Sequence, residues 1–174
     1  MMYIEDDNFL EDVHKRFIDS VILTDKFPFY WNSSAVTNDD LGFLVHNVLI
    51  RPEDRNDNDG INSSAYEIFC EMLDCFTKKH NIEYKEILRI SVNLTMNIGL
   101  EKSQIHKDHN FPHNQLLIYL NNFEGGSTEI LNDDKTIFKT TQPKKFLGVC
   151  FGHKDHYAYL PEKGRRLVAV YTFR

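Results

Sequence analysis

Residues 114–131 read NQLLIYLNNFEGGSTEIL, and this stretch indicates how the second half of the chain folds. An apolar run precedes the Asn-Asn pair at 121–122, and a second, shorter one follows the Gly-Gly pair at 125–126. Short apolar runs separated by asparagine and glycine are typical of β-strands joined by turns. We therefore expect two strands here, with a turn between them.

The same texture extends outward from this stretch over the rest of the second half. Runs rich in β-branched and aromatic residues recur, and Gly, Asn, Asp or Pro separates each from the next. They read ILRISVNLTMNI (87–98), TIFKTT (136–141), KKFLGVCFG (144–152) and RLVAVYTFR (166–174). A succession of such strands predicts an antiparallel β-sandwich or jelly roll.

The first half of the chain carries helical patterns instead. Apolar residues recur at helical spacing over 8–22 and over 62–81, which predicts two amphipathic helices. LGFLVHNVLI (41–50) is a plausible buried strand between them. The expected buried faces consist of Phe9, Leu10, Val13, Phe17 and Val21 in the first helix, and of Tyr66, Phe69, Leu73 and Phe76 in the second. Together the patterns predict an α+β fold with N-terminal helices packed on one sheet.

Length and composition suit one globular domain over 1–174, with a mostly helical part at 1–85 and a β-rich core at 86–174 that carries the site. The chain has 174 residues, of which 41% are hydrophobic and 26% charged. The net charge is −6 and no basic stretch stands out, so nucleic acid is a disfavoured partner.

The cysteines and the N-terminal sequence favour a cytoplasmic protein. Cys70, Cys75 and Cys150 are odd in number and lack CxxC spacing, which argues against a disulfide framework or a thiolate zinc site. The N-terminal residues are acidic and lack an apolar core, so we expect no signal peptide. No run of eighteen apolar residues occurs, and we expect no membrane association.

The tetrapeptide HKDH occurs twice, at 106–109 and at 153–156. In an extended segment, residues i and i+2 point to the same side, so His106 and Asp108 can reach one ion together. A second histidine would complete the two-histidine, one-carboxylate set of non-haem Fe(II) oxygenases. An HxD triplet alone is weak evidence, because the second copy also contains one. The order of the copies favours the first, since no histidine follows His156 and His156 lies 48 residues beyond Asp108.

From residue 97 to residue 173, the sequence resembles the 2-oxoglutarate/Fe(II)-dependent dioxygenases, in particular the prolyl-4-hydroxylase-like branch and small bacterial and phage oxygenases. That branch has HxD, an apolar strand ending in YLN, GG-x-T, a proline before a strand and a distal histidine. A glycine follows the distal histidine after eight residues and a basic residue after ten. The matching residues here are His106-Lys107-Asp108, LLIYLNNFEGGSTEIL (116–131), Pro143, His156, Gly164 and Arg166. The resemblance implies a double-stranded β-helix, the cupin-like form of the jelly roll.

The resemblance also implies the metal ligands and catalytic centre. Fe(II) would be held by His106, Asp108 and His156. His153 is a rival for the third ligand, but its spacing to the later basic residue fits the branch less well. His109 is then a bystander or a supporting group.

A co-substrate site follows from the same resemblance. Arg166 is expected to bind the distal carboxylate of 2-oxoglutarate, since a guanidinium pairs with a carboxylate through two charge-assisted hydrogen bonds. Arg165, on the opposite face of the strand, is the alternative. Tyr119 is expected near the co-substrate and Thr128 in the same pocket. Asn97 stands where the branch often has a tyrosine that hydrogen-bonds the co-substrate, and its amide is also a donor.

The implied activity is hydroxylation of an unactivated C–H bond with 2-oxoglutarate as co-substrate and O2 as oxidant, with ascorbate as an additional reductant. Peptidyl proline is the first expected substrate, and a free amino acid or other small metabolite the next. A nucleobase is third, disfavoured by the acidic charge. Two other classes stay open: a jelly-roll module that binds a metal without turnover, and a zinc hydrolase, because two histidines and a carboxylate also hold zinc.

Overall fold

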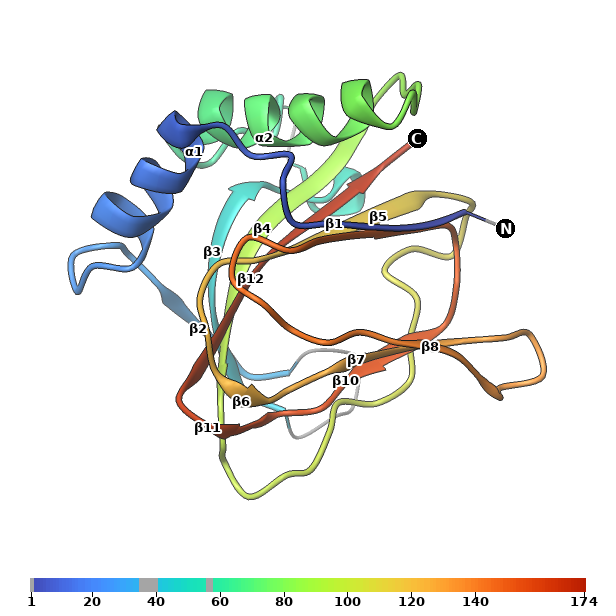
Figure 1. Cartoon of the computed structure of the whole chain (residues 1–174). Coiled ribbons are helices and arrows are strands. Elements are labelled where there is room, and N and C mark those ends of the chain that lie inside the picture. The colour runs from blue at the N-terminus through green and yellow to red at the C-terminus, as the bar shows by residue number, and fades with distance from the viewer. Residues whose placement is uncertain (1, 35–40, 56–57) are drawn as a thin grey trace.

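The computed structural model describes residues 2–34, 41–55 and 58–174, and a seven-stranded sheet lies at its centre (Figure 1). Its strand order is β1-β9-β5-β12-β4-β3-β2, and every pairing in it is antiparallel. The strands are β1 (Tyr3–Asp6), β2 (Tyr30–Asn32), β3 (Phe43–Leu49), β4 (Ile87–Met96), β5 (Asn114–Tyr119), β9 (Gly148–Phe151) and β12 (Arg165–Phe173).

Two smaller sheets complete the β-structure of the described residues. One has the order β10-β7-β8 and the other pairs β11 with β6. Their strands are β6 (Glu124–Gly125), β7 (Thr128–Leu131), β8 (Ile137–Thr140), β10 (His156–Ala158) and β11 (Pro161–Lys163). The predicted antiparallel jelly roll is thereby confirmed.

The helices cover one side of the large sheet, as predicted, and the three-stranded sheet lies on the other side (Figure 1). Helix α1 (Asp12–Phe17) continues into a π-helical turn (Ile18–Ile22), and α2 (Tyr66–Lys79) is the longest helix; a 3-10 turn (Pro52–Asp54) follows β3. Residues 1–85 also supply β1, β2 and β3 to the large sheet, so the predicted division at residue 85 into a helical part and a β-core is less sharp than expected.

Alternation along β12 creates two cores on the two sides of the large sheet. Leu167, Ala169 and Tyr171 belong to the cluster beneath the helices, whereas Val168 and Val170 belong to the cluster on the side of the small sheet. Successive side chains of a strand point to opposite faces, so a run of apolar residues supplies both clusters at once. The same alternation turns Arg166 toward the interior of the jelly roll, where it is buried.

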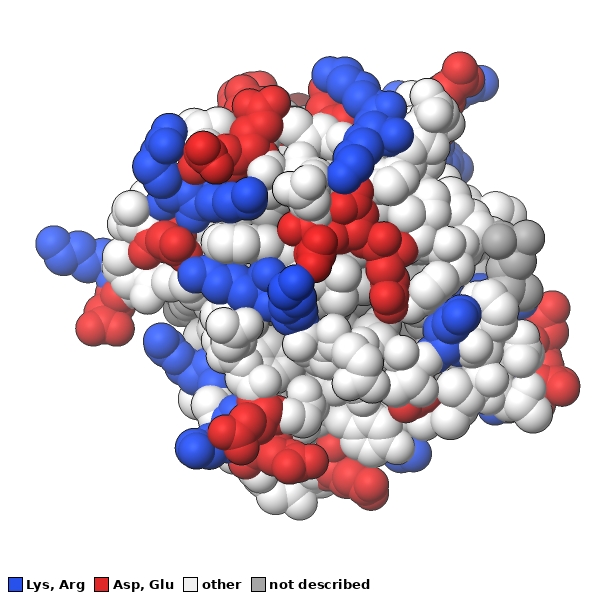
Figure 2. All heavy atoms as spheres, viewed as in Figure 1, with Lys and Arg blue, Asp and Glu red and all other residues white. Residues whose placement is uncertain are grey.

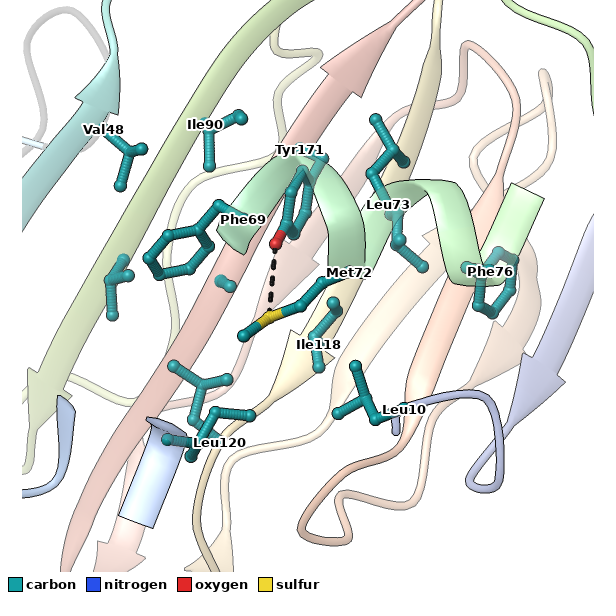
Figure 3. Close-up of a cluster of buried hydrophobic side chains, with 14 of the residues drawn as sticks. Leu10, Val48, Phe69, Met72, Leu73, Phe76, Ile90, Ile118, Leu120 and Tyr171 are labelled. Carbon is teal, nitrogen blue, oxygen red and sulfur yellow. Dashed lines mark hydrogen bonds between the residues drawn. The ribbon is translucent and has the colours of Figure 1, made fainter. Parts of the chain in front are cut away.

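Helix α2 anchors the larger core (Figure 3). Phe69, Met72, Leu73 and Phe76 are fully buried against the sheet, and the hydroxyl of Tyr171 donates to the sulfur of Met72 at 3.8 Å. Burial of each such side chain contributes about 1.5–3 kcal/mol. The predicted stripe on this helix is therefore correct in its central residues and is extended by Met72.

The buried face predicted for the first helical segment is partly correct, since Phe9 and Leu10 are buried and Phe17 packs against the core. Val13 and Val21 are 44% and 40% exposed, while His14, Ile18 and Ile22 are buried. After Phe17 the helix widens into the π-helical turn, in which the backbone N–H of Leu23 donates to the carbonyl of Ile18 at 3.0 Å. A wider turn rotates the later residues relative to regular helical spacing.

The surface carries charges of both signs. Figure 2 shows acidic and basic side chains interspersed over the face in view. None of the helices in the described part of the chain is both long and apolar enough to cross a membrane.

Candidate metal centre

The two HKDH copies lie side by side because His106 and His156 pair with each other. The backbone N–H of each donates to the carbonyl of the other at 3.0 Å, which forms an isolated antiparallel bridge. Asp108 lies two residues further along the first copy. The structure thus brings together His106, Asp108 and His156, with one ligand atom from each within 4.8 Å of the other two.

Both histidines present the same nitrogen to this centre. Nδ1 of His106 is 2.9 Å from the carbonyl of Gln104, and Nδ1 of His156 is 3.2 Å from the carbonyl of Lys154. A carbonyl oxygen only accepts, so each Nδ1 carries the proton and each Nε2 keeps its lone pair. Burial, followed by the charge of His106, lowers the pKa of His156 to about 4, so this ring is neutral near pH 7. A neutral imidazole held by a carbonyl is a typical metal ligand.

Asp108 keeps one carboxylate oxygen without a partner. Oδ1 accepts hydrogen bonds from Arg89 at 2.8 Å and from Arg51 at 3.1 Å. Oδ2 is buried, has no hydrogen-bond partner among the described residues, and faces Nε2 of His156 at 3.5 Å. Burial raises the pKa of Asp108, but the charge of Arg89 and the weaker effects of the other neighbouring cations outweigh it and hold the pKa well below its usual range.

Oδ2 of Asp108 and Nε2 of His156 both direct a lone pair toward the same space. Their proximity is unfavourable unless a cation lies between them. An unsatisfied buried acceptor costs about 1–3 kcal/mol, and more when it is charged. The amide nitrogen of Gln115 is 3.3 Å from Nε2 of His156, which is a long contact for a hydrogen bond. Two imidazoles and one carboxylate with an open oxygen fit a divalent metal such as Fe(II) or Zn(II).

A cavity of about 100 Å³ joins this centre to Arg166. Nε of Arg166 donates to the carbonyl of Gly126, and Nη2 donates to Oγ1 of Thr128, both at 3.0 Å. Burial lowers the pKa of Arg166, and among the described residues no carboxylate lies within ion-pair distance of it. Thr128 also lines the cavity, whereas Arg165 is exposed on the opposite face of β12.

Tyr119 lies behind the cavity wall and does not line it. Its hydroxyl is 2.9 Å from Oγ1 of Thr128 and 2.9 Å from Oγ1 of Thr141, and its ring centroid is 5.5 Å from the guanidinium carbon of Arg166. Tyr119 therefore supports the two residues that do face the cavity.

Asn97 is not brought to the cavity. It is exposed in the turn beyond β4, where its side-chain oxygen accepts a hydrogen bond from the backbone of Gly99 at 3.1 Å. Asn93 and Thr95, earlier on β4, line the cavity instead. Strand alternation would turn residue 97 inward as well, but β4 ends at Met96 and the alternation ends with it.

The remaining groups of the two HKDH copies point elsewhere. Nε2 of His109 contacts Oγ1 of Thr172 at 2.8 Å, and the ring is buried. His153 contacts His113 through their Nδ1 atoms at 3.1 Å. Asp155 forms an ion pair with Lys135 at 2.7 Å. The second HxD therefore supplies none of the three grouped ligand atoms.

Sequence reasoning missed Arg51 and Arg89. Arg89 lies within the apolar run of β4, where a buried cation requires a polar or anionic partner. That requirement was a usable signal for a nearby carboxylate. Arg51 lies in a polar stretch and carried no such signal.

Comparisons with known proteins place the fold. No family model and no curated protein matches this sequence. The chain is similar to the structure of a 2OG-Fe(II) oxygenase family oxidoreductase from Burkholderia pseudomallei, with a TM-score of 0.75, 15% identity, and coverage of 98% of this chain and 84% of the other. It is also similar to a Pseudomonas putida prolyl-4-hydroxylase, with a TM-score of 0.63, 14% identity, and coverage of 99% of this chain and 91% of the other. A third similar structure is that of SnoK, a non-heme alpha ketoglutarate dependent carbocyclase from nogalamycin biosynthesis. Its TM-score is 0.66 and its identity 7%, and the match covers 98% of this chain and 78% of the other.

Proposed function

We propose that this chain, which has the fold of the 2-oxoglutarate/Fe(II) oxygenases, is itself a 2-oxoglutarate- and Fe(II)-dependent dioxygenase that hydroxylates an unactivated C–H bond. One observation carries the proposal. A single cavity has the three grouped ligand atoms on one part of its wall and the buried guanidinium of Arg166 on another. A dicarboxylate co-substrate needs both features, one for each of its ends.

Each residue has a separate task in this proposal. His106, Asp108 and His156 would hold the metal through Nε2, Oδ2 and Nε2. Arg166 binds the distal carboxylate of 2-oxoglutarate with the N–H groups that Gly126 and Thr128 leave free. When bound, Fe(II) with 2-oxoglutarate supplies the oxidation of the substrate by O2. Ascorbate belongs in the assay as a reductant.

The apolar lining assists by excluding water from the reacting region. Leu117, Val168 and Val170 line the cavity together with the polar groups. Burial strengthens the attraction between the Arg166 guanidinium and a carboxylate, because the local dielectric constant is lower than that of water. These side chains come from β5 and β12, which are paired neighbours in the large sheet.

A second, open groove of about 830 Å³ supports access for a larger substrate. It runs beside β2 and β3 and shares Phe43, Arg51, Arg89 and His106 with the inner cavity. A peptide segment fits such a groove, so peptidyl proline is the first proposed substrate and a free amino acid or small metabolite the second. A nucleobase is less favoured, because the net charge is −6.

The first test is formation of the co-substrate complex. The purified protein is reconstituted with Fe(II) without oxygen, 2-oxoglutarate is added, and the weak visible charge-transfer band is recorded. We expect a band that is lost with His156→Ala and that requires much more 2-oxoglutarate with Arg166→Ala. Arg165→Ala is the matched control, because it removes the neighbouring exposed arginine, and its titration should equal that of the wild type.

Turnover separates the proposed enzyme from its rivals. On admission of O2, formation of succinate is expected even without a substrate, through uncoupled decarboxylation. Metal binding with no band and no succinate would support the non-catalytic metal-binding module or the zinc hydrolase instead.

A further inference from the structure

Asp108 is held by two arginines that arrive from different parts of the chain. Arg89 lies on β4, and its Nη1 donates to Oδ1 of Asp108 at 2.8 Å. Arg51 follows β3, and its Nη2 donates to the same oxygen at 3.1 Å. Nη1 of Arg51 also donates to the backbone carbonyl of Asp108 at 2.7 Å. Three donors therefore fix one residue, and none of them reaches Oδ2.

Charge balance does not explain this arrangement. Asp108 is the one carboxylate paired with both guanidiniums among the described residues, and Glu53 and Asp54 act on Arg89 only through their charges. The two guanidiniums also repel each other. Burial, followed by the charge of Arg51, lowers the pKa of Arg89 to about 10, which still leaves Arg89 charged near neutral pH. Such a costly arrangement calls for a geometric reason.

The geometric consequence lies in how a carboxylate binds a metal. A free carboxylate is able to bind through one oxygen or through both. With Oδ1 occupied by two charged donors, only Oδ2 remains, and it is the oxygen that faces His156. One-oxygen binding leaves one more coordination position open than two-oxygen binding does.

We infer that Arg51 and Arg89 are positioning residues that reserve Oδ1 and thereby restrict Asp108 to one-oxygen binding of the metal. The inference rests on the proposed metal centre. The arginines act on the metal only through Asp108, and they keep a coordination position free for the co-substrate or the oxidant.

The two arginines contribute unequally. The side chain of Arg89 is 11% exposed, and among the described residues it donates to the carboxylate of Asp108 alone. The side chain of Arg51 is 30% exposed. Water screens an exposed ion pair more than a buried one. Loss of Arg89 should therefore have the larger effect on the metal.

Binding of Co(II) to the metal-free protein tests the inference without any turnover. Cobalt reports its coordination through the intensity of its visible absorption. We expect Arg89→Met to raise the Kd for Co(II) roughly 10- to 100-fold, as loss of a supporting group around a metal ligand commonly does. We also expect a changed visible spectrum, because Oδ1 then keeps only the longer, more exposed contact with Arg51, and that contact competes less well with the metal for this oxygen. Arg89→Lys should recover part of both effects, since it restores a cation near Oδ1.

Arg55→Lys is the matched control. Arg55 lies close to Arg51 in sequence and donates to two backbone carbonyls, those of Ile50 and Leu88. Its replacement should leave the Co(II) affinity and spectrum unchanged. If Arg89→Met does not fold, as judged by circular dichroism, Arg51→Met replaces it, with a smaller change expected in both the spectrum and the Kd.

The outcomes separate the inference from the proposed function. If a folded variant binds Co(II) with the affinity and spectrum of the wild type, the role of the two arginines is refuted while the metal centre stands. If the wild type itself does not bind Co(II), the metal centre fails, and the inference fails with it.

Discussion

Replacement of Asp108 by asparagine should destabilise the metal-free protein. Removal of a ligand commonly stabilises an empty metal site, because clustered ligand groups repel one another. Here the carboxylate is also the shared anion of Arg51 and Arg89. Asp108→Asn leaves two guanidiniums without their counter-charge, and one of them is almost completely buried. The sign of the effect is therefore opposite to that of an ordinary ligand replacement.

The magnitude follows from the burial of each pair. Asp108 and Arg89 have side chains that are 4% and 11% exposed, and loss of one partner from a buried ion pair costs about 3–5 kcal/mol. Arg51 is 30% exposed, so screening limits its pair to roughly 0–1 kcal/mol. An asparagine amide oxygen would still accept a hydrogen bond from Arg89, which places the expected loss near the lower limit, about 3 kcal/mol.

Urea unfolding of the metal-free proteins, with a chelator present, measures this loss. His106→Gln is the control, because it removes a ligand but leaves both arginine contacts with Asp108 in place. We expect the free energy of unfolding of this control to lie within about 1 kcal/mol of the wild type. An Asp108→Asn protein as stable as the wild type, or more stable, would refute the assignment of Asp108 as the counter-charge of the two arginines.

Three further predictions concern the core, the pH dependence and the co-substrate site. Leu73→Ala, at a fully buried position of α2, should lower the free energy of unfolding in urea by about 2–5 kcal/mol; a loss below 1 kcal/mol would contradict the packing. Asp6 forms an ion pair with Lys79 at 2.7 Å. Burial raises the pKa of Asp6, but the hydrogen bond from Lys79 and further contacts outweigh burial and lower this pKa from 3.8. Because the folded-state pKa of Asp6 is below the unfolded one, this stabilisation is present above pH 3.8 and is lost as the pH falls below that value. The difference in free energy of unfolding between Asp6→Asn and the wild type should therefore shrink as the pH falls. A difference that stays constant would contradict this role of Asp6. Gly126 has φ +66°, and a Cβ there would lie 2.7 Å from the ring of Phe123 and 3.2 Å from Cδ of Arg166. Gly126→Ala should therefore weaken 2-oxoglutarate binding, measured by calorimetry, and leave the Kd for Co(II) unchanged. Equal loss of both affinities would indicate general disruption of the fold.

Local periodicity explains part of the prediction of the candidate site. His106 and Asp108 are two residues apart, so a short extended segment suffices to bring them to one side. Arg165 and Arg166 are adjacent on a strand, so one of them must face inward, and the family resemblance favoured Arg166. The structure buries Arg166 and exposes Arg165.

Short and irregular elements were less predictable. The strands β6, β10 and β11 have two or three residues each, which is too few for a pattern to emerge. The expected role of Asn97 depended on β4 continuing past Met96, whereas the chain turns there. The predicted burial of Val21 was wrong because the π-helical turn changes the spacing of the later residues of this helix.

The sequence by itself thus determined the longer strands of the second half, the two helical segments and the pairing of His106 with Asp108, because these depend on side chains that alternate or recur over a few residues. The family resemblance supplied His156 as the third candidate ligand. Only the tertiary structure determined which groups surround the carboxylate of Asp108. Arg51 and Arg89 precede it by 57 and 19 residues and reach it through the pairing of β3 with β4 and the fold of the intervening chain. No local period relates such residues, since contacts of this kind arise from the packing of elements that are distant in sequence.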